Sequence, residues 1–205
     1  MPKIIAPSFY FIGNHLALDF LNTKVVSAGN LVDLLQTSND VLNWLVQAGS
    51  LTAEQMNAVN AMWREGNTLV QEAVELRTGI RTLVRQGMQG EDAADEDMER
   101  VNRILRGKAV TVRLVQHHRR FASIRHTELR HPVDLLIPVA EAAVDLLVNV
   151  DLGLVKKCGN PDCVLYFYDN SKNNTRRWCS QKTCGNRMKV AAYLERKKRE
   201  EKNRM

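Results

Sequence analysis

A chain of 205 residues with 44 % hydrophobic and 25 % charged residues has the composition of a soluble globular protein, and its length fits one core domain plus a small module. No apolar run approaches the ~20 residues of a membrane span, and the N-terminus has no apolar core long enough for a signal peptide, so we exclude a membrane protein and expect a cytoplasmic one. The net charge of +6 is uneven, because residues 153–205 carry 14 Lys and Arg against 5 Asp and Glu, whereas the preceding 152 residues carry 15 against 18.

The first part of the chain predicts helices. Residues 37–40 offer N-cap side chains before an apolar run, and Gly49 suits the position just after a helix end. Thr52 is expected to cap a long helix that reaches about Val84, with a break at Gly66 or Gly79. The acidic run at 91–97 then begins another helix, where negative charge suits the helix dipole.

A strand pattern interrupts these helices. Residues 109–116 begin with alternating apolar and polar side chains, and residues 121–124 extend the pattern as a short hairpin. Pro132 and Pro138 then lead into a buried type of helix. We therefore predict a mainly helical domain over residues 1–152 and a fold class that is mainly α with a small β-hairpin (α+β).

Four cysteines carry the clearest chemical signal, with the spacing Cys158-x4-Cys163-x15-Cys179-x4-Cys184. Each short-spaced pair supplies two thiolates from one tight turn, as a tetrahedral zinc ion requires. Disulfides or free thiols are the alternative, but in a reducing cytosol paired cysteines more often bind metal. Because four thiolates leave no position for a catalytic water, we expect one structural Zn²⁺.

The segment around these cysteines, residues 153–205, predicts a small module. Val164–Tyr168 has the β-branched and aromatic content of a strand, residues 169–174 have turn chemistry, and Thr175–Trp178 is expected to return as the second strand. A final basic helix opens at Cys184. A knuckle, a hairpin and a helix that starts at the last ligand make a treble-clef-like zinc finger.

Several blocks of residues resemble known families. The module resembles the bacterial CGNR zinc-finger family in Cys158-Gly159-Asn160-Pro161-Asp162-Cys163, Tyr168-Asp169 with Ser171, Arg176-Arg177-Trp178-Cys179-Ser180 and Cys184-Gly185-Asn186-Arg187. The N-terminal part resembles the ABATE domain, the usual companion of that finger, in Gly13-Asn14-His15 and Leu18-Asp19-Phe20-Leu21-Asn22-Thr23. The resemblance implies that the four cysteines are the metal ligands and that the protein is a stress-induced transcription regulator.

Basic residues near the cysteines predict a nucleic-acid surface. Guanidinium groups on a rigid metal-held scaffold grip phosphate or a guanine edge with two hydrogen bonds. The expected contacts are Lys172, Arg176, Arg177, Arg187 and Lys189. A solvated basic face is the alternative reading. Trp178 either stacks on a base or packs over the metal site, and the packing role is the commoner one.

A ligand pocket is a further hypothesis. His15, Asp19 and Asn22 follow i, i+4, i+7 spacing and share one helix face, where they either bind a small molecule or act as capping and solvated groups.

The sequence lacks a nucleophile elbow, a phosphate loop and an HExxH helix, so we do not expect an enzyme. We expect a DNA-binding transcription regulator whose N-terminal domain senses a small-molecule ligand, mediates dimerisation, or both. A homodimer is expected because one finger buries little surface on DNA. The rival interpretation is an RNA-binding or protein-docking finger without sequence-specific DNA recognition, since the fold alone does not choose between them.

Overall fold

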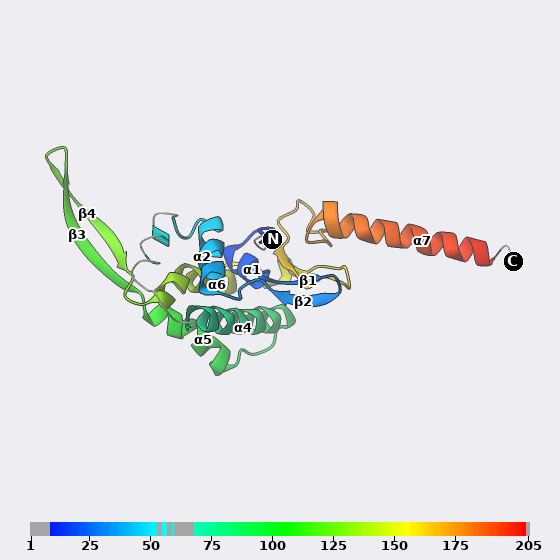
Figure 1. The fold of residues 1–205 in the computed structure, drawn as a ribbon, viewed down its shortest axis with the longest axis horizontal. Helices are drawn as coiled ribbons and strands as arrows, with labels where there is room; N and C mark the ends of the chain where they lie inside the picture. Colours follow the sequence, from blue (N-terminus) through cyan, green and yellow to red (C-terminus); the bar gives the residue numbers. More distant parts are fainter. Residues whose placement is uncertain (1–8, 53–54, 57–58, 60–67, 204–205) are drawn as a thin grey trace, which may run out of the picture. The chain divides into compact units, whose positions relative to one another are not determined.

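The computed structural model describes residues 9–52, 55–56, 59 and 68–203, and its elements are shown in Figure 1. The chain forms two compact units. The helical unit spans Leu35–Val150, and the finger unit combines the described residues up to Leu34 with those from Asp151 onward. The helical domain expected from the sequence covers residues 1–152, whereas the structure groups the described residues up to Leu34 with the cysteine module. Within the described residues, no helix combines the length and apolar character needed to cross a membrane.

Helix α2 (Ser38–Gln47) opens the helical unit and has the predicted ends. Thr37 is the N-cap, and it forms a reciprocal capping box with Asp40. Gly49, at φ +72°, follows the C-cap, as predicted. Its N–H donates to the carbonyl of Val46, and the N–H of the next residue donates to the carbonyl of Leu45, which together make a Schellman ending.

The second predicted helix is described only in part. Thr52 and Gln55 exchange side-chain to backbone hydrogen bonds, so Thr52 caps a helical turn as expected. Gly66 lies outside the described residues. From Thr68 to Gln89 helix α4 is continuous, so the break considered at Gly79 does not occur. A Cβ atom at Gly79 would lie 3.0 Å from the Cβ of Arg100, so the glycine instead allows helix α5 to approach closely.

Helix α5 (Asp95–Arg106) has the predicted acidic first turn. A short 3-10 helix (Pro132–Leu136) leads into helix α6 (Ile137–Asn149), which has the predicted proline at its start. The apolar faces of the four helices make the core of this unit. Its largest fully buried side chains include Trp44, Leu45, Leu76, Ile80, Val84, Leu136 and Leu146.

The predicted hairpin is confirmed and is longer than expected. Strands β3 (Ala109–His117) and β4 (Arg120–Glu128) pair antiparallel over nine residue pairs. The two residues between them, His118 and Arg119, have φ values of 45° and 65°. Both central residues of a type I′ turn require positive φ, and this turn follows the natural twist of a hairpin.

The finger unit contains two small antiparallel sheets. Strands β1 (Lys24–Ser27) and β2 (Asn30–Asp33) form one. Strands β5 (Val155–Lys157) and β6 (Tyr166–Tyr168) form the other.

The β5–β6 sheet differs from the hairpin predicted for the finger. Thr175–Trp178 forms no strand, and the partner of β6 is the segment that precedes the first cysteine. The loop between β5 and β6 therefore carries the first cysteine pair. A 3-10 turn (Leu152–Leu154) precedes β5, and a π-helical turn (Gln181–Gly185) precedes helix α7 (Asn186–Lys202), which extends away from the rest of this unit in Figure 1.

The free edge of β6 is covered by the N-terminal segment and helix α1 (Leu16–Leu21). The backbone N–H of Tyr168 donates to the carbonyl of Gly13 at 2.7 Å, and the side chain of Asn14 donates to the carbonyl of Tyr168 at 3.0 Å. Asn14 has φ 59°, a left-handed conformation that asparagine tolerates better than most residues. This edge pairing explains why residues before Leu34 belong to the finger unit.

Candidate metal centre

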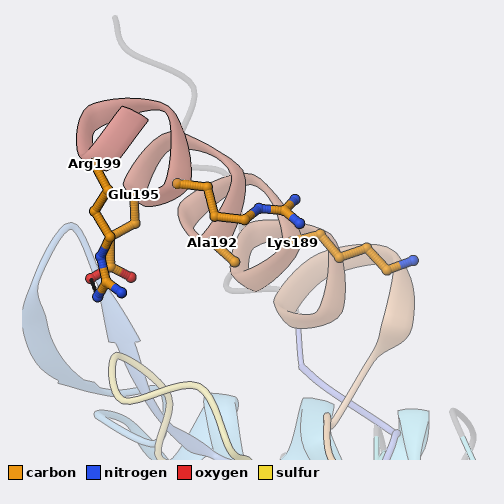
Figure 2. A pocket seen from close by; sticks show the side chains of 5 residues that line it. Lys189, Ala192, Glu195 and Arg199 are labelled. Atoms are coloured by element: carbon orange, nitrogen blue, oxygen red, sulfur yellow. Dashed lines mark hydrogen bonds and ion pairs between the residues drawn. The ribbon is translucent and has the colours of Figure 1, made fainter. Parts of the chain in front are cut away.

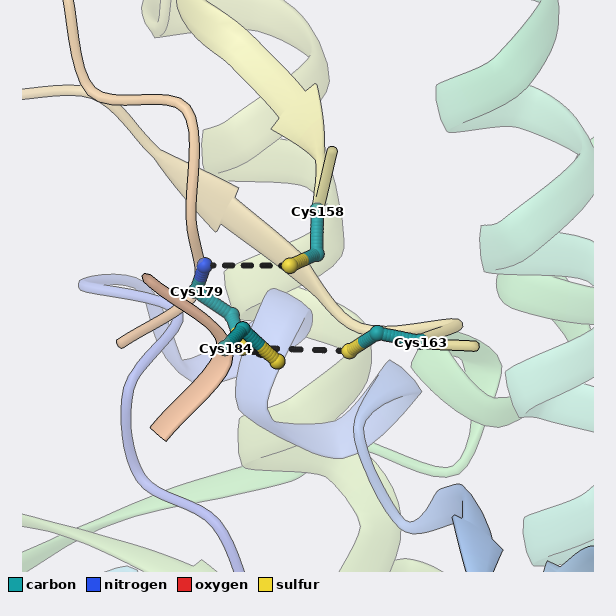
Figure 3. Close-up of side chains that lie close together, drawn as sticks. All are labelled: Cys158, Cys163, Cys179 and Cys184. Atoms are coloured by element: carbon teal, nitrogen blue, oxygen red, sulfur yellow. Dashed lines mark hydrogen bonds between the residues drawn. The ribbon is translucent and has the colours of Figure 1, made fainter. Parts of the chain in front are cut away.

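The four cysteines meet in one place. Their sulfur atoms all lie within 4.8 Å of one another, and the four side chains converge in Figure 3. Cys158 and Cys163 come from the β5–β6 loop, Cys179 ends the following loop, and Cys184 lies in the π-helical turn before α7. The spacing in the sequence therefore brings together sulfur atoms from three segments.

The distances between the sulfur atoms suit a tetrahedral ion. Cys163 Sγ and Cys179 Sγ are 3.8 Å apart, and Cys179 Sγ and Cys184 Sγ are 3.6 Å apart. A tetrahedron with Zn–S bonds of about 2.3 Å has edges of about 3.8 Å. The hydrogen bond with Cys163, burial and the nearby thiolate charges raise the pKa of Cys179, so these sulfurs ionise together only when a cation compensates them. The cluster is a four-thiolate metal site.

Hydrogen bonds to the sulfur atoms surround the cluster. The backbone N–H of Cys179 donates to Cys158 Sγ at 3.3 Å, and the side-chain amide of Asn160 donates to Cys184 Sγ at 3.4 Å. Such donors stabilise thiolates and orient them toward a metal. Asn160 is buried, and the sequence analysis did not single it out as a site residue. Asn160 lies between the ligands Cys158 and Cys163 of the first knuckle, and this position is the sequence signal that could have identified it as a site residue.

Close packing joins the two knuckles, which are the turns that carry the cysteine pairs Cys158 and Cys163 and Cys179 and Cys184. The N–H of Gly159 donates to the carbonyl of Arg177 at 2.8 Å, and a Cβ atom at Gly159 would lie 3.1 Å from both that oxygen and the ring of Trp178. A side chain there would push the two segments apart. The contact gives Trp178 the packing role considered for it in the sequence analysis.

Asp169 organises the loop between β6 and Cys179. Its carboxylate is fully buried and accepts hydrogen bonds from the N–H and hydroxyl of Ser171, the N–H of Arg176 and the ammonium of Lys156. Burial alone would raise the pKa of Asp169, but Lys156 and the other hydrogen bonds together hold this pKa well below its usual range. Charged and fully hydrogen-bonded, Asp169 fixes the path of the chain into the second knuckle.

Arg176, one of the predicted nucleic-acid contacts, makes structural contacts within the finger unit. Its guanidinium donates to the carbonyls of Ile12, Trp178 and Cys179, and it lies 4.1 Å from the ring centre of Phe167. These bonds join the N-terminal segment to the second knuckle through Nε and Nη2 of the guanidinium. Arg176 is therefore a structural residue of the metal site.

The other predicted contacts lie on the surface. Lys172, Arg177, Arg187 and Lys189 are all exposed. The guanidinium of Arg177 lies 5.2 Å from the ring centre of Trp178. Arg187 also lines a hollow of about 260 Å³ beside the cysteines, together with apolar Ile12, Val25 and Leu165.

The three residues of the predicted ligand pocket make hydrogen bonds within the finger unit. His15 is the N-cap of α1 and accepts the N–H of Ala17. Asp19 accepts the N–H of Gly13 at 2.7 Å. Burial raises the pKa of Asp19, and the hydrogen bonds from Gly13 and Ile12 partly offset that rise.

Asn22 holds β6 from its free edge. Its side-chain oxygen accepts the N–H of Tyr166 at 2.8 Å, and its side-chain nitrogen donates to the carbonyl of Tyr166 at 2.9 Å. The amide thus pairs with the strand as a neighbouring backbone would. Asn22 is buried, so both bonds are made away from bulk water.

Comparison with protein-family models finds a match for each of the two parts of the chain. The family model ABATE, described as "Putative stress-induced transcription regulator", matches residues 14–150, and the CGNR zinc finger model matches residues 155–197. The chain belongs to the ABATE family, and its C-terminal module is a CGNR zinc finger. A comparison with curated proteins found no match. The ABATE match begins at Asn14, so it includes the segment that covers β6 in the finger unit.

Proposed function

We propose that the chain is a cytoplasmic DNA-binding transcription regulator whose four thiolates hold one structural Zn²⁺. The observation that carries this proposal is helix α7. Across Asn186–Lys202 the helix has no buried residue, and it carries seven Lys and Arg against three Glu. The helix begins at the π-helical turn that contains Cys184, so the metal site fixes its start.

The exposure of α7 is the reason to expect a macromolecular partner. A helix without buried residues gains little stability from packing, so a role outside the chain accounts best for its length of about 25 Å. Lys189, Arg196 and Arg199 line one side of it with Ala192 and Glu195, and four of these residues are labelled in Figure 2. Basic side chains spaced along a helix suit phosphates beside a DNA groove.

The start of α7 is the expected point of contact with bases. Arg187 and Lys189 lie in its first turn, close to the cysteines, where the metal restricts the motion of the backbone. Exposed Lys172 and Arg177 on the preceding loop are the other expected contacts. We propose that the remainder of the chain senses a ligand or brings two copies together, and that the protein acts by binding and not by catalysis.

Neutralising the first turn of α7 tests the proposal. We expect the double variant Arg187→Gln, Lys189→Gln to bind duplex DNA at least tenfold more weakly, with the slope of log K against log salt reduced by about 2, because each phosphate contact contributes about 0.9. Fluorescence anisotropy over a salt series measures both quantities. Arg85→Gln, an exposed arginine of α4, is the matched control and should change neither.

A protein-docking or RNA-binding role is the second candidate, and α7 also carries the observation that favours docking. Val190, Tyr193 and Leu194 are large apolar residues exposed on it. If the double variant binds DNA as tightly as the wild type, the basic turn is not a DNA contact and the docking role is the better account. Preference for a structured RNA over duplex DNA in direct competition would select the RNA role.

A further inference from the structure

The β3–β4 hairpin carries a concentrated positive charge. Residues 109–127 contain four Arg and three His and no Asp or Glu. The rest of the helical unit, residues 35–108 and 128–150, carries nine Lys and Arg against fifteen Asp and Glu. The hairpin extends beyond the helices of this unit in Figure 1. A unit that is otherwise acidic therefore concentrates net positive charge on one projecting element.

The arginines of the hairpin are available to a partner. Arg113, Arg119 and Arg120 are exposed, and no carboxylate among the described residues forms an ion pair with any of them. On the neighbouring helix α5, by contrast, Arg100 pairs with Asp97 and Arg103 pairs with Glu72. Guanidinium groups without such partners attract a polyanion, because each phosphate that they neutralise releases a condensed counterion.

The register of the hairpin gathers basic residues on one face. Arg113 and His117 lie on the same side of β3, and Arg120 joins them because it pairs directly with His117. At ~3.4 Å per residue, Arg113 and His117 lie about 14 Å apart along the strand. This spacing is close to the ~12 Å width of the major groove of B-DNA. The two ends of the basic face can therefore reach phosphates on both sides of a groove.

The tip of the hairpin has a strained backbone. His118 and Arg119 have φ values of 45° and 65°, which side chains with a Cβ atom adopt at a cost. Asn-Gly is the usual sequence for a turn of this type and adopts positive φ more readily. Strain of this kind is typical of positions that contact a ligand. The tip thus places two basic residues where turn chemistry alone favours others.

Large apolar side chains are exposed beside the charges. Leu114 and Phe121 are 70 % and 72 % exposed on one face, and Ile124 is 46 % exposed on the face of Arg113. A lipid surface requires the apolar groups on one face and the charges on the other, and this hairpin does not separate them. Aromatic and aliphatic groups beside arginine do suit DNA, where they contact thymine methyl groups or wedge between base steps.

We propose that the β3–β4 hairpin is an arm that binds duplex DNA by entering a groove. The major groove of B-DNA admits a two-stranded β-ribbon, whereas the major groove of A-form RNA is too deep and narrow for side chains to read. Arg113, Arg119 and Arg120 contact phosphates, and Phe121 contacts the bases. The arm is a second DNA-binding element in addition to α7, and this role builds on the function proposed above.

Neutralising the tip of the arm in the full zinc-loaded chain tests this role. We expect the double variant Arg119→Gln, Arg120→Gln to bind a fluorescent duplex DNA at least tenfold more weakly at ~150 mM salt. The slope of log K against log salt should fall by about 2, since two phosphate contacts are lost. Fluorescence anisotropy over a salt series measures both quantities.

Two matched variants serve as controls for the tip substitutions. Arg85→Gln, Arg106→Gln removes the same charge from exposed positions of α4 and α5 and should leave the affinity and the slope unchanged. Arg119→Lys, Arg120→Lys keeps the charge and should keep the slope. Circular dichroism of each variant checks that the strand content is retained.

The arm and α7 are separated by combining their variants. In the background of Arg187→Gln, Lys189→Gln, the tip substitutions should lower the slope by about a further 2. If only the tip substitutions lower it, the arm binds DNA and the role proposed for α7 fails alone.

Three results would overturn the role of the arm. A slope that falls with the α7 substitutions and not with the tip substitutions leaves α7 as the DNA element without the arm. Equal weakening by the α4 and α5 control shows that total charge, not the arm, sets the affinity. A structured RNA that displaces the DNA better than the same concentration of duplex, and loses this advantage in the tip variant, makes the arm an RNA element.

Discussion

Replacing Cys179 by serine is expected to unfold residues 155–195 while the helical unit stays folded. The module has one two-stranded sheet with strands of three residues and a helix without buried residues, which is too little apolar core for independent stability. Binding of a structural Zn²⁺ contributes on the order of 10 kcal/mol or more in modules of this size. A site with three thiolates loses much of that contribution.

Amide hydrogen exchange of the full chain measures this effect unit by unit. Protection should disappear around Cys158 and in strand β6 and persist in α4 and α6. Ser180→Ala, next to the ligand, is the control and should leave protection unchanged. Native protection throughout residues 155–195 of the Cys179→Ser variant would show that the metal is dispensable for this fold.

Asn22→Ala is expected to destabilise the finger unit by about 2–4 kcal/mol. The substitution removes both hydrogen bonds to the backbone of Tyr166 and leaves its N–H and carbonyl without those partners. Each such group costs about 1–3 kcal/mol when water replaces the partner incompletely. Because Asn22 lies 144 residues away in sequence, the variant measures how strongly the N-terminal segment holds the finger.

Zinc release during urea unfolding, followed with a chromogenic chelator, reports the change in Asn22→Ala. The variant should release zinc at a lower urea concentration than the wild type. Asn30→Ala removes an exposed asparagine side chain at the start of strand β2 in the same unit and is the matched control. If the two variants release zinc at the same urea concentration, the bonds to β6 contribute nothing to the finger.

Local signals in the sequence predicted the elements whose partners are close by. Thr37 and Gly49 define the two ends of α2 through bonds within a few residues, and the acidic first turn does the same for the start of α5. The alternation at 109–116 predicted β3 because the partner strand follows after a two-residue turn. The cysteine spacing predicted the metal site for the same reason, since the thiols of each pair are only five residues apart.

Long-range pairing limited the prediction elsewhere. Thr175–Trp178 has strand-like content, but the backbone N–H of Arg176 donates to Asp169 and the carbonyl of Arg177 accepts from Gly159, so these groups are not available to a ladder with β6. The spacing of His15, Asp19 and Asn22 suggested that the three residues share one helix face. It did not reveal that Asn22 pairs with Tyr166, because nothing local to either residue encodes that contact.

Charge counting did not separate an arginine with structural contacts from an exposed one. Arg176 and Arg177 are adjacent in sequence, yet the first donates to three carbonyls of the finger unit and the second is exposed. A guanidinium that satisfies buried carbonyls cannot be distinguished by composition from one that faces solvent.

The central claim is that the zinc-held α7 binds specific DNA, and selection of genomic DNA fragments by the zinc-loaded protein tests it most directly. The selection is run at ~150 mM salt with a structured RNA as competitor, because phosphate contacts alone depend steeply on salt. The account predicts enrichment of one DNA motif that the Arg187→Ala variant no longer enriches. Failure to enrich any motif, or loss of all DNA binding to the RNA competitor, would contradict it.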